Sequence, residues 1–306
     1  MQESEFIAYL RGRISHPAAR GLNDDCAVLS DFGMDHLVLT HDMLVIGTHV
    51  LSDCAPEDVA WKLVGVNLSD LAAKGAEPIG VLLGYMLGST DWDARFATGL
   101  GEALSHYETA LLGGDTVSGP SDSQAPRAFG LTAIGRATPV PVPSRSGARP
   151  GDTLWVTGSI GLAMLGYLGE TGAAPSDEAA RARYLRPSPR LTEGRALAPF
   201  VTAMMDISDG LLLDTQRIAQ ASGVTIALDS AAIPLSDTIR NDPDLRGQAL
   251  AWGDDYELLF TLPSEVEPPI AATRIGTVRA AGPHALLIDG DAPDPAQSLG
   301  WEHGQI

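Results

Sequence analysis

Aspartates that follow apolar segments and stand beside Gly, Ser or Thr recur at six places in the chain. The six boxes are Asn23-Asp24-Asp25, Thr40-His41-Asp42, Asn67-Leu68-Ser69-Asp70, Gly113-Gly114-Asp115-Thr116, Asp206-Ile207-Ser208-Asp209-Gly210 and Gly253-Asp254-Asp255-Tyr256. Isolated carboxylates in such places would be costly to desolvate. Carboxylates that converge on a divalent cation avoid this cost, because Mg²⁺ takes oxygen ligands and is usually shared with substrate phosphates. The boxes therefore favour metal-assisted phosphate chemistry, provided that the fold brings them together.

Each box also has an ordinary structural interpretation. Taken alone, three of them are typical of helix caps or turns: Asp209, Asp254-Asp255 and Asp24-Asp25. The glycine pair before Asp115 favours a functional role more strongly, because glycines let backbone N–H groups approach a phosphate. Asp70 also favours function, because it interrupts a helix that is otherwise dominated by apolar residues.

The sequence lacks the usual machinery for phosphate and acyl transfer. It contains no G-x-x-x-x-G-K-[ST] loop, no protein-kinase set of motifs and no G-x-S-x-G elbow. Its seven histidines show no metal-ligand spacing such as H-E-x-x-H. The aspartates must therefore carry any chemistry.

Composition excludes several classes of function. The formal net charge of −19 argues against sequence-independent binding to nucleic acid or to an anionic membrane surface. No stretch is apolar and long enough for a membrane span, and the start does not resemble a signal peptide. Cys26 and Cys54 form no C-x-x-C pair and are typical of reduced thiols. We therefore expect a cytoplasmic globular protein.

Apolar periodicity and turn residues predict the elements that must position the boxes. Strands are expected at 26–29, 36–40, 81–83, 110–112, 153–156, 203–205, 224–228 and 256–261. Helices are expected at 3–13, 56–74, 92–107, 190–197 and 210–221, with another near Leu162. The proline-rich run 137–150 is the best candidate for a linker. It divides the chain into two α+β domains, 1–138 and 150–306.

In this order the boxes resemble those of the thiamine-monophosphate kinase family, within the superfamily that includes aminoimidazole-ribonucleotide synthetase and selenophosphate synthetase. The matching segments are Asp24-Asp25-Cys26-Ala27-Val28, Thr40-His41-Asp42-Met43-Leu44-Val45, Val66-Asn67-Leu68-Ser69-Asp70-Leu71-Ala72-Ala73, Gly113-Gly114-Asp115-Thr116, Arg145-Ser146-Gly147-Ala148-Arg149-Pro150-Gly151-Asp152, Asp206-Ile207-Ser208-Asp209-Gly210-Leu211 and Asp255-Tyr256-Glu257-Leu258. The resemblance implies an N-terminal mixed-sheet domain that binds ATP and metal. It also implies a C-terminal α/β sandwich domain and a homodimer formed through the first-domain sheets.

The resemblance implies roles for individual residues. The metal ligands would be Asp25, Thr40, His41, Asp42, Asp70, Asp115, Asp206 and Asp209. The contacts to ATP would be Gly114, Asp115, Arg145 and Ser208, and the contacts to substrate His49, Asp254 and Trp301. Three positions depart from the family pattern: Asn23 replaces a Gly, His41 a Thr, and Asp254 a longer Glu. His41 would then act through its backbone carbonyl, and a buried structural role remains the alternative for His49.

The activity implied by the resemblance is transfer of the γ-phosphoryl group of ATP to thiamine monophosphate, giving thiamine diphosphate with several Mg²⁺ ions. The acceptor phosphate has a second pKa of about 6 and is already ionised at neutral pH, so no catalytic general base is expected. One alternative is another ATP-dependent enzyme of the superfamily. A selenophosphate synthetase fits less well, because no cysteine precedes Asp24-Asp25. The other alternative is a catalytically silent module that binds nucleotide or metal.

Overall fold

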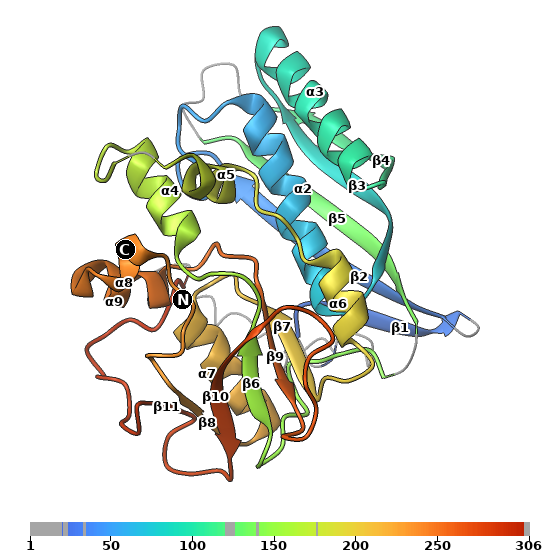
Figure 1. Cartoon of the computed structure of the whole chain (residues 1–306). Coiled ribbons are helices and arrows are strands. Elements are labelled where there is room, and N and C mark those ends of the chain that lie inside the picture. Colours follow the sequence, from blue (N-terminus) through green and yellow to red (C-terminus); the bar gives the residue numbers. More distant parts are fainter. Residues whose placement is uncertain are drawn as a thin grey trace.

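The protein is built around two mixed β-sheets, each with helices packed on it (Figure 1). The computed structural model describes residues 20, 24–32, 35–119, 126–138, 141–175 and 177–302. The helix expected at 3–13 lies outside these residues. Among the described residues, no helix is both long and apolar enough to cross a membrane.

The first sheet has five strands in the order β1-β2-β5-β3-β4. Its elements in chain order are β1 (Ala27–Phe32), β2 (Asp35–Val45), α2 (Pro56–Ala73), β3 (Glu77–Leu87), α3 (Thr90–His106), β4 (Ala110–Ser118) and β5 (Ala128–Ala137). Only β3 and β4 run parallel, and the other neighbours are antiparallel. A parallel neighbour needs a crossover, which α3 supplies.

The two faces of the first sheet differ. Helices α2 and α3 cover one face, and their apolar residues share a core with the sheet (Figure 1). On the other face Met43 and Val117 are both 53% exposed. The register places Met43, Gly130, Gly84 and Asp115 in one row across the strands, so Asp115 also points to this uncovered face.

Helix α2 joins the two halves of the molecule. Pro56 stands at its first position, and the acidic Glu57 and Asp58 occupy its first turn, where the helix dipole favours them. Fifteen of its 18 residues are buried, so it packs on more than one side. Its C-terminal residues Ala72 and Ala73 belong to a core cluster with residues of the second sheet.

The second sheet has six strands in the order β11-β8-β10-β6-β9-β7. Its elements in chain order are β6 (Thr153–Val156), α4 (Leu162–Glu170), α5 (Glu178–Leu185), α6 (Leu191–Leu197), β7 (Ala203–Asp206), α7 (Leu211–Ser222), β8 (Thr225–Leu228), α8 (Asp237–Arg240), α9 (Pro243–Trp252), β9 (Leu258–Leu262), β10 (Thr273–Arg279) and β11 (Leu286–Ile288). Strands β6 to β9 are entirely buried, which explains why they read as short continuous apolar runs.

Close backbone contact fixes the second half against α2. A Cβ atom built on Gly194 of α6 would lie 2.0 Å from the carbonyl oxygen of Ala72, so only glycine permits this approach. The sequence patterns predicted most of the elements that border the boxes. They did not predict β5, β10, β11, α5, α8 or α9, because these carry weak or short periodic signals.

Candidate active site

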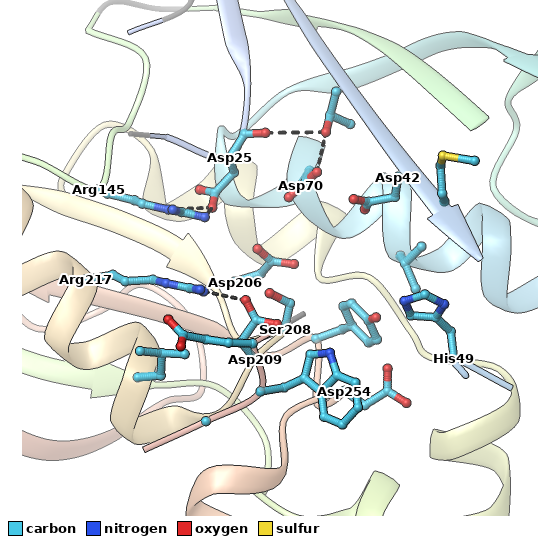
Figure 2. A pocket seen from close by; sticks show the side chains of 18 of the residues that line it. Asp25, Asp42, His49, Asp70, Arg145, Asp206, Ser208, Asp209, Arg217 and Asp254 are labelled. Carbon is cyan, nitrogen blue, oxygen red and sulfur yellow. Dashed lines mark hydrogen bonds and ion pairs between the residues drawn. The ribbon is translucent and has the colours of Figure 1, made fainter. Parts of the chain in front are cut away.

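A large cavity lies between the two halves and collects most of the residues singled out in the sequence (Figure 2). Its volume is about 1640 Å³. The first half contributes Asp25, Thr40, His41, Asp42, His49 and Asp70, and the second half contributes Asp206, Ser208, Asp209, Asp254 and Trp301. Arg145, from the segment that links the halves, also lines it.

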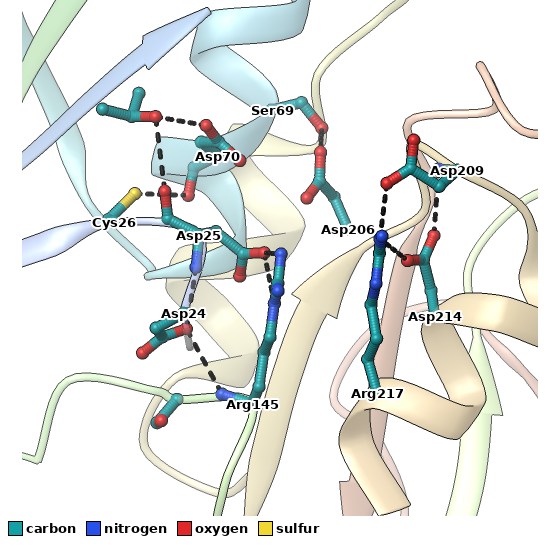
Figure 3. Close-up of polar contacts among 12 residues, drawn as sticks. Asp24, Asp25, Cys26, Ser69, Asp70, Arg145, Asp206, Asp209, Asp214 and Arg217 are labelled. Atoms are coloured by element: carbon teal, nitrogen blue, oxygen red, sulfur yellow. Dashed lines mark hydrogen bonds and ion pairs between the residues drawn. The ribbon is translucent and has the colours of Figure 1, made fainter. Parts of the chain in front are cut away.

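Three carboxylates from different elements meet at one end of the cavity. Asp25 precedes β1, Asp70 lies in α2, and Asp206 is the last residue of β7. One carboxylate oxygen from each lies within 4.8 Å of the others. Ser69, next to Asp70, donates a hydrogen bond of 2.6 Å to Asp206, and so ties α2 to the second sheet (Figure 3).

Strand β2 presents two further predicted ligands to this group. The Thr40 hydroxyl donates to the carboxylate of Asp70 and lies 3.4 Å from the carbonyl oxygen of Asp25. The backbone N–H of Asp42 donates to the Asn67 side chain at 3.0 Å, which fixes β2 against α2. Asp42 lies beside the same cavity (Figure 2).

The alternation of β2 separates His41 from its neighbours. Successive side chains in a strand point to opposite faces, and the His41 side chain is exposed where Thr40 is buried. The His41 Nδ1 atom lies 2.9 Å from the Thr132 hydroxyl, on the uncovered face of the sheet. Only the backbone of His41 can therefore act together with the cluster of carboxylates as a ligand.

Burial and mutual repulsion raise the pKa values of these carboxyl groups. Burial, followed by repulsion from Asp209 and Asp25, raises the pKa of Asp42 to about 6. Burial and then Asp25 raise the pKa of Asp206 to about 8, although the Ser69 hydrogen bond opposes the rise. Burial and the neighbouring carboxylates Asp42 and Asp206 raise the pKa of Asp70 well above its ordinary value.

The segment after β7 places Ser208 and Asp209 on the cavity. Gly210 follows with a φ of 122°, and a Cβ there would lie 3.0 Å from the backbone of Ala251. A residue with a side chain would therefore be strained in this turn. The buried Asp214 of α7 accepts a hydrogen bond from the Asp209 backbone N–H at 3.1 Å, which stabilises the turn.

Two arginines lie beside acidic residues of the cavity (Figure 3). Arg145 Nε donates to Asp25 at 2.7 Å. Burial alone would lower the pKa of Arg145, but the charge of Asp25 raises it. Arg217 of α7 donates to Asp209 and, at 2.8 Å, to Asp214. Arg217 was missing from the predicted site, although its i, i+3 spacing from Asp214 was a usable signal.

Two of the three predicted substrate contacts, His49 and Asp254, lie at the far end of the cavity (Figure 2). His49 Nδ1 accepts the backbone N–H of Val45 at 2.9 Å, in the turn after β2. Asp254, with a φ of 61°, forms an ion pair with the buried Lys62. The backbone N–H of Trp301 donates to the carbonyl of Asp209 at 2.8 Å.

Aromatic rings not singled out in the sequence line the same end. The ring centroids of Tyr167 and Trp252 are 5.0 Å apart, and those of Tyr167 and Tyr184 are 5.6 Å apart. All three residues line the cavity. They come from α4, α9 and α5, so no local sequence pattern connects them.

Gly114 and Asp115 are the two predicted site residues that do not line the cavity. They lie on β4, the edge strand farthest from β1, and are not among the described residues that line the cavity. A Cβ on Gly114 would lie 2.0 Å from the carbonyl oxygen of Leu83, so the glycine lets β4 approach β3. Within one chain, these two residues therefore lie apart from the other predicted ligands.

The cluster of carboxylates is suited to binding a hard divalent cation. It offers oxygen ligands from Asp25, Asp70 and Asp206, with Thr40 and Asp42 adjacent. Among the described residues, no Lys or Arg forms an ion pair with Asp42, Asp70 or Asp206. Buried carboxylates without cationic partners are costly, and a cation would remove the cost.

Two family models match the chain. Residues 23–137 match the model described as AIR synthase related protein, N-terminal domain. Residues 149–283 match the model described as AIR synthase related protein, C-terminal domain. Hydrogenase maturation protein HypE shares this fold, with a TM-score of 0.71 at 22% identity.

Three curated relatives carry the name thiamine-monophosphate kinase. The Escherichia coli (strain K12) protein is 39% identical over 254 residues, which cover 79% of this chain and 76% of the relative. The Caulobacter vibrioides protein is 38% identical and covers 94% of this chain and 86% of the relative. The Leptospira interrogans protein is 33% identical and covers 99% and 98%.

Solved structures agree with these relatives. The structure described as AaThiL complexed with AMPPCP and TMP has a TM-score of 0.87 at 30% identity, and the match covers 99% of this chain and 97% of that one. Thiamine-monophosphate kinase from Stenotrophomonas maltophilia K279a has a TM-score of 0.77 at 34% identity, with coverage of 94% and 96%. Since these likenesses extend over both halves and the cavity between them, the chain belongs to the thiamine-monophosphate kinase family.

Proposed function

We propose that this protein transfers the γ-phosphoryl group of ATP to thiamine monophosphate, forming thiamine diphosphate and ADP. The observation that carries the proposal is the convergence of Asp25, Asp70 and Asp206 from both halves on one cavity. The relatives named above support it, as does the related complex with AMPPCP and TMP. AMPPCP is an analogue of ATP that resists transfer of its terminal phosphoryl group.

Within the cavity, we assign the acidic end to nucleotide and metal. Asp25, Thr40, Asp42, Asp70, Asp206 and Asp209, with the backbone of His41, would hold several Mg²⁺ ions. Bound Mg²⁺ would neutralise the phosphates and orient the acceptor for in-line attack. Arg145 and Ser208 would contact ATP. Arg217 adds a second guanidinium on the same wall, suited to a phosphate oxygen.

The aromatic end is the proposed place for the thiamine rings. Tyr167, Tyr184 and Trp252 offer flat apolar surfaces, and Asp254, paired with Lys62, lies on the same cavity. A cationic heteroaromatic ring is attracted by such aromatic faces. His49 and Trp301, which line the same cavity, would complete the contacts to the substrate.

The positions of Gly114 and Asp115 favour a homodimer. Asp115 shares the uncovered face of the first sheet with the exposed apolar side chains of Met43, Leu82 and Val117. A second copy packed on this face would bury these side chains, as a stable interface requires. It would also allow Gly114 and Asp115 to act at the site of the other copy.

We also propose the domain division 1–138 and 150–306, which follows the two sheets, and a cytoplasmic location. Cys26 and Cys54 are free thiols, in keeping with a reducing compartment.

Turnover with purified protein tests the proposed reaction. With ATP and Mg²⁺, thiamine monophosphate should yield thiamine diphosphate, and unphosphorylated thiamine should yield nothing. Thiamine lacks the phosphate that is both nucleophile and metal ligand. EDTA should stop the reaction and excess Mg²⁺ restore it. Nucleotide binding without any thiamine diphosphate, detected by chromatography, would instead identify a silent binding module.

A further inference from the structure

The only two lysines of the chain occupy unusual places. Lys62 and Lys74 are the two lysines among 20 Lys and Arg residues. Their side chains are 1% and 0% exposed. Lysine is almost never fully buried unless it is paired, and all other Lys/Arg positions are arginine. Both lysine ammonium groups of the chain are therefore buried. A planar guanidinium would fit these positions differently.

Lys74 bridges two aspartates of the first acidic box. It is the residue that follows α2, and its Nζ lies 2.6 Å from Asp24 Oδ1 and 2.5 Å from Asp25 Oδ2. Nζ also lies 3.4 Å from the carbonyl oxygen of Met204 in the second half. The ammonium group is thus surrounded by oxygens from both halves, in the manner of a bound metal ion.

The aspartates that Lys74 contacts also have arginine partners. Arg20 forms an ion pair with Asp24, and Arg145 forms one with Asp25. The side chains of Asp24 and Asp25 are each 1% exposed, so these charges interact with little screening by water. Burial by itself would lower the pKa of Lys74, but the two carboxylates raise it, and the lysine stays charged.

The rest of the acidic group lacks such partners. In the described part of the chain, the carboxylate of Asp70 accepts a hydrogen bond only from the Thr40 hydroxyl, and that of Asp206 only from the Ser69 hydroxyl. Among the same residues, no Lys or Arg forms an ion pair with Asp42 either. Lys and Arg side chains therefore neutralise Asp24 and Asp25. The other acidic residues, Asp42, Asp70 and Asp206, are not neutralised in this way.

We propose that Lys74 is a positioning residue that acts as an internal cation at the Asp24–Asp25 pair. It holds the pair in place before any metal binds, and its charge weakens the affinity of the adjoining carboxylates for divalent ions. Metal would then bind first against Asp42, Asp70 and Asp206, with Asp25 supplying a ligand already oriented by Lys74. This role rests on the metal binding proposed above, but not on turnover.

Titration of metal-free protein with Mn²⁺, followed by electron paramagnetic resonance of the free ion, tests this role. Lys74→Met keeps the length of the side chain and removes its charge. The variant should melt at a lower temperature without metal, because the buried Asp24 and Asp25 lose the positive charge that they share. It should bind Mn²⁺ roughly tenfold more tightly or better, since a nearby positive charge is gone. Saturating Mn²⁺ should restore most of the lost melting temperature.

Lys62→Met is the matched control, because it removes the other buried lysine, whose partner Asp254 lies at the far end of the cavity. It should also lower the melting temperature, but leave the affinity for Mn²⁺ within about twofold of the parent. If Lys74→Met does not fold without metal, Lys74→Gln keeps one donor group and removes the charge.

The outcomes separate this inference from the proposed function. Weaker or unchanged Mn²⁺ binding by both Lys74 variants would overturn the role of Lys74, and so would an equal gain by Lys62→Met. A parent protein that binds no Mn²⁺ at all would instead contradict the metal site under "Proposed function".

Discussion

The hydroxyl of Ser69 donates a 2.6 Å hydrogen bond to the carboxylate of Asp206, and thereby joins α2 of the first half to β7 of the second. Both groups are buried, with 0% and 3% of their surface exposed. The bond favours the ionised form of Asp206, because it opposes the rise of its pKa. A single hydroxyl therefore links the contact between the halves to the charge state of the acidic group.

Ser69→Ala should raise the Mg²⁺ concentration needed for half-maximal activity several-fold. It should also lower the stability of the metal-free protein by about 1–3 kcal/mol, because a buried acceptor loses its partner. Activity against Mg²⁺ concentration and thermal unfolding measure the two effects. Ser89→Ala is the control, because it removes the cap of α3 and should cost stability without changing the Mg²⁺ requirement. Equal metal curves for Ser69→Ala and the parent protein would contradict this coupling.

Asp42→Asn should abolish turnover without destabilising the metal-free protein. Asp42 is half-buried and repelled by Asp209 and Asp25, so removing its charge relieves repulsion. Its structural bond to Asn67 runs through the backbone and survives the substitution. Thermal unfolding in EDTA should give an equal or higher melting temperature. A large loss of stability would show that the carboxylate makes essential structural contacts.

The stability of the metal-free protein should fall as pH rises from about 4 to about 8. The pKa values of Asp42 and Asp206 are raised from 3.8 to about 6 and about 8 in the folded state. In this window the folded state binds more protons than the unfolded state, so the free energy of unfolding decreases with pH and levels off above the folded pKa values. Thermal unfolding in EDTA across this range measures the slope.

Mg²⁺ should reverse this trend, because bound metal keeps the carboxylates ionised. The rise in melting temperature on adding Mg²⁺ should therefore be larger at pH 8 than at pH 6. A rise in metal-free stability between these pH values would contradict the assignment of raised pKa values. Asp42→Asn should show a shallower slope than the parent.

Replacement of His49 by Asn should raise the KM for thiamine monophosphate more than it lowers kcat. The acceptor phosphate is already ionised, so the mechanism needs no proton acceptor. His41→Asn should likewise leave saturated turnover nearly unchanged, since that side chain faces the uncovered side of the sheet. Steady-state kinetics decide the matter. A loss in kcat of about 10²–10⁴-fold at constant KM for His49→Asn would indicate a general acid or base instead.

Mixing Asp42→Asn with Asp115→Asn protein should restore activity that each variant lacks alone. If Asp115 acts at the site of the other copy, a mixed dimer has one site with both substitutions and one with neither. With random pairing of equal amounts, about one site in four is then intact. Co-expression with two different affinity tags isolates the mixed dimer. A mixed dimer without activity would place the role of Asp115 within its own chain.

Local sequence signals were enough to predict helices and strands whose formation depends on residues that are neighbours along the chain. The proline and acids at the start of α2 predicted that helix, and short apolar runs predicted β6, β7 and β8. The order of the aspartate boxes along the chain was enough to indicate the family. Residue type also limited the chemistry, because carboxylates without a paired histidine suit metal and phosphate.

Only the tertiary structure decided which of these residues meet. Asp25, Asp70 and Asp206 are brought together because α2 packs against both sheets, a contact between distant segments that no local pattern encodes. The pleat of β2 turned His41 away from Thr40, and the edge position of β4 separated Asp115 from the rest. The bridge of Lys74 to Asp24 and Asp25 also came from packing, because charge partners are fixed by burial and proximity rather than by spacing along the chain.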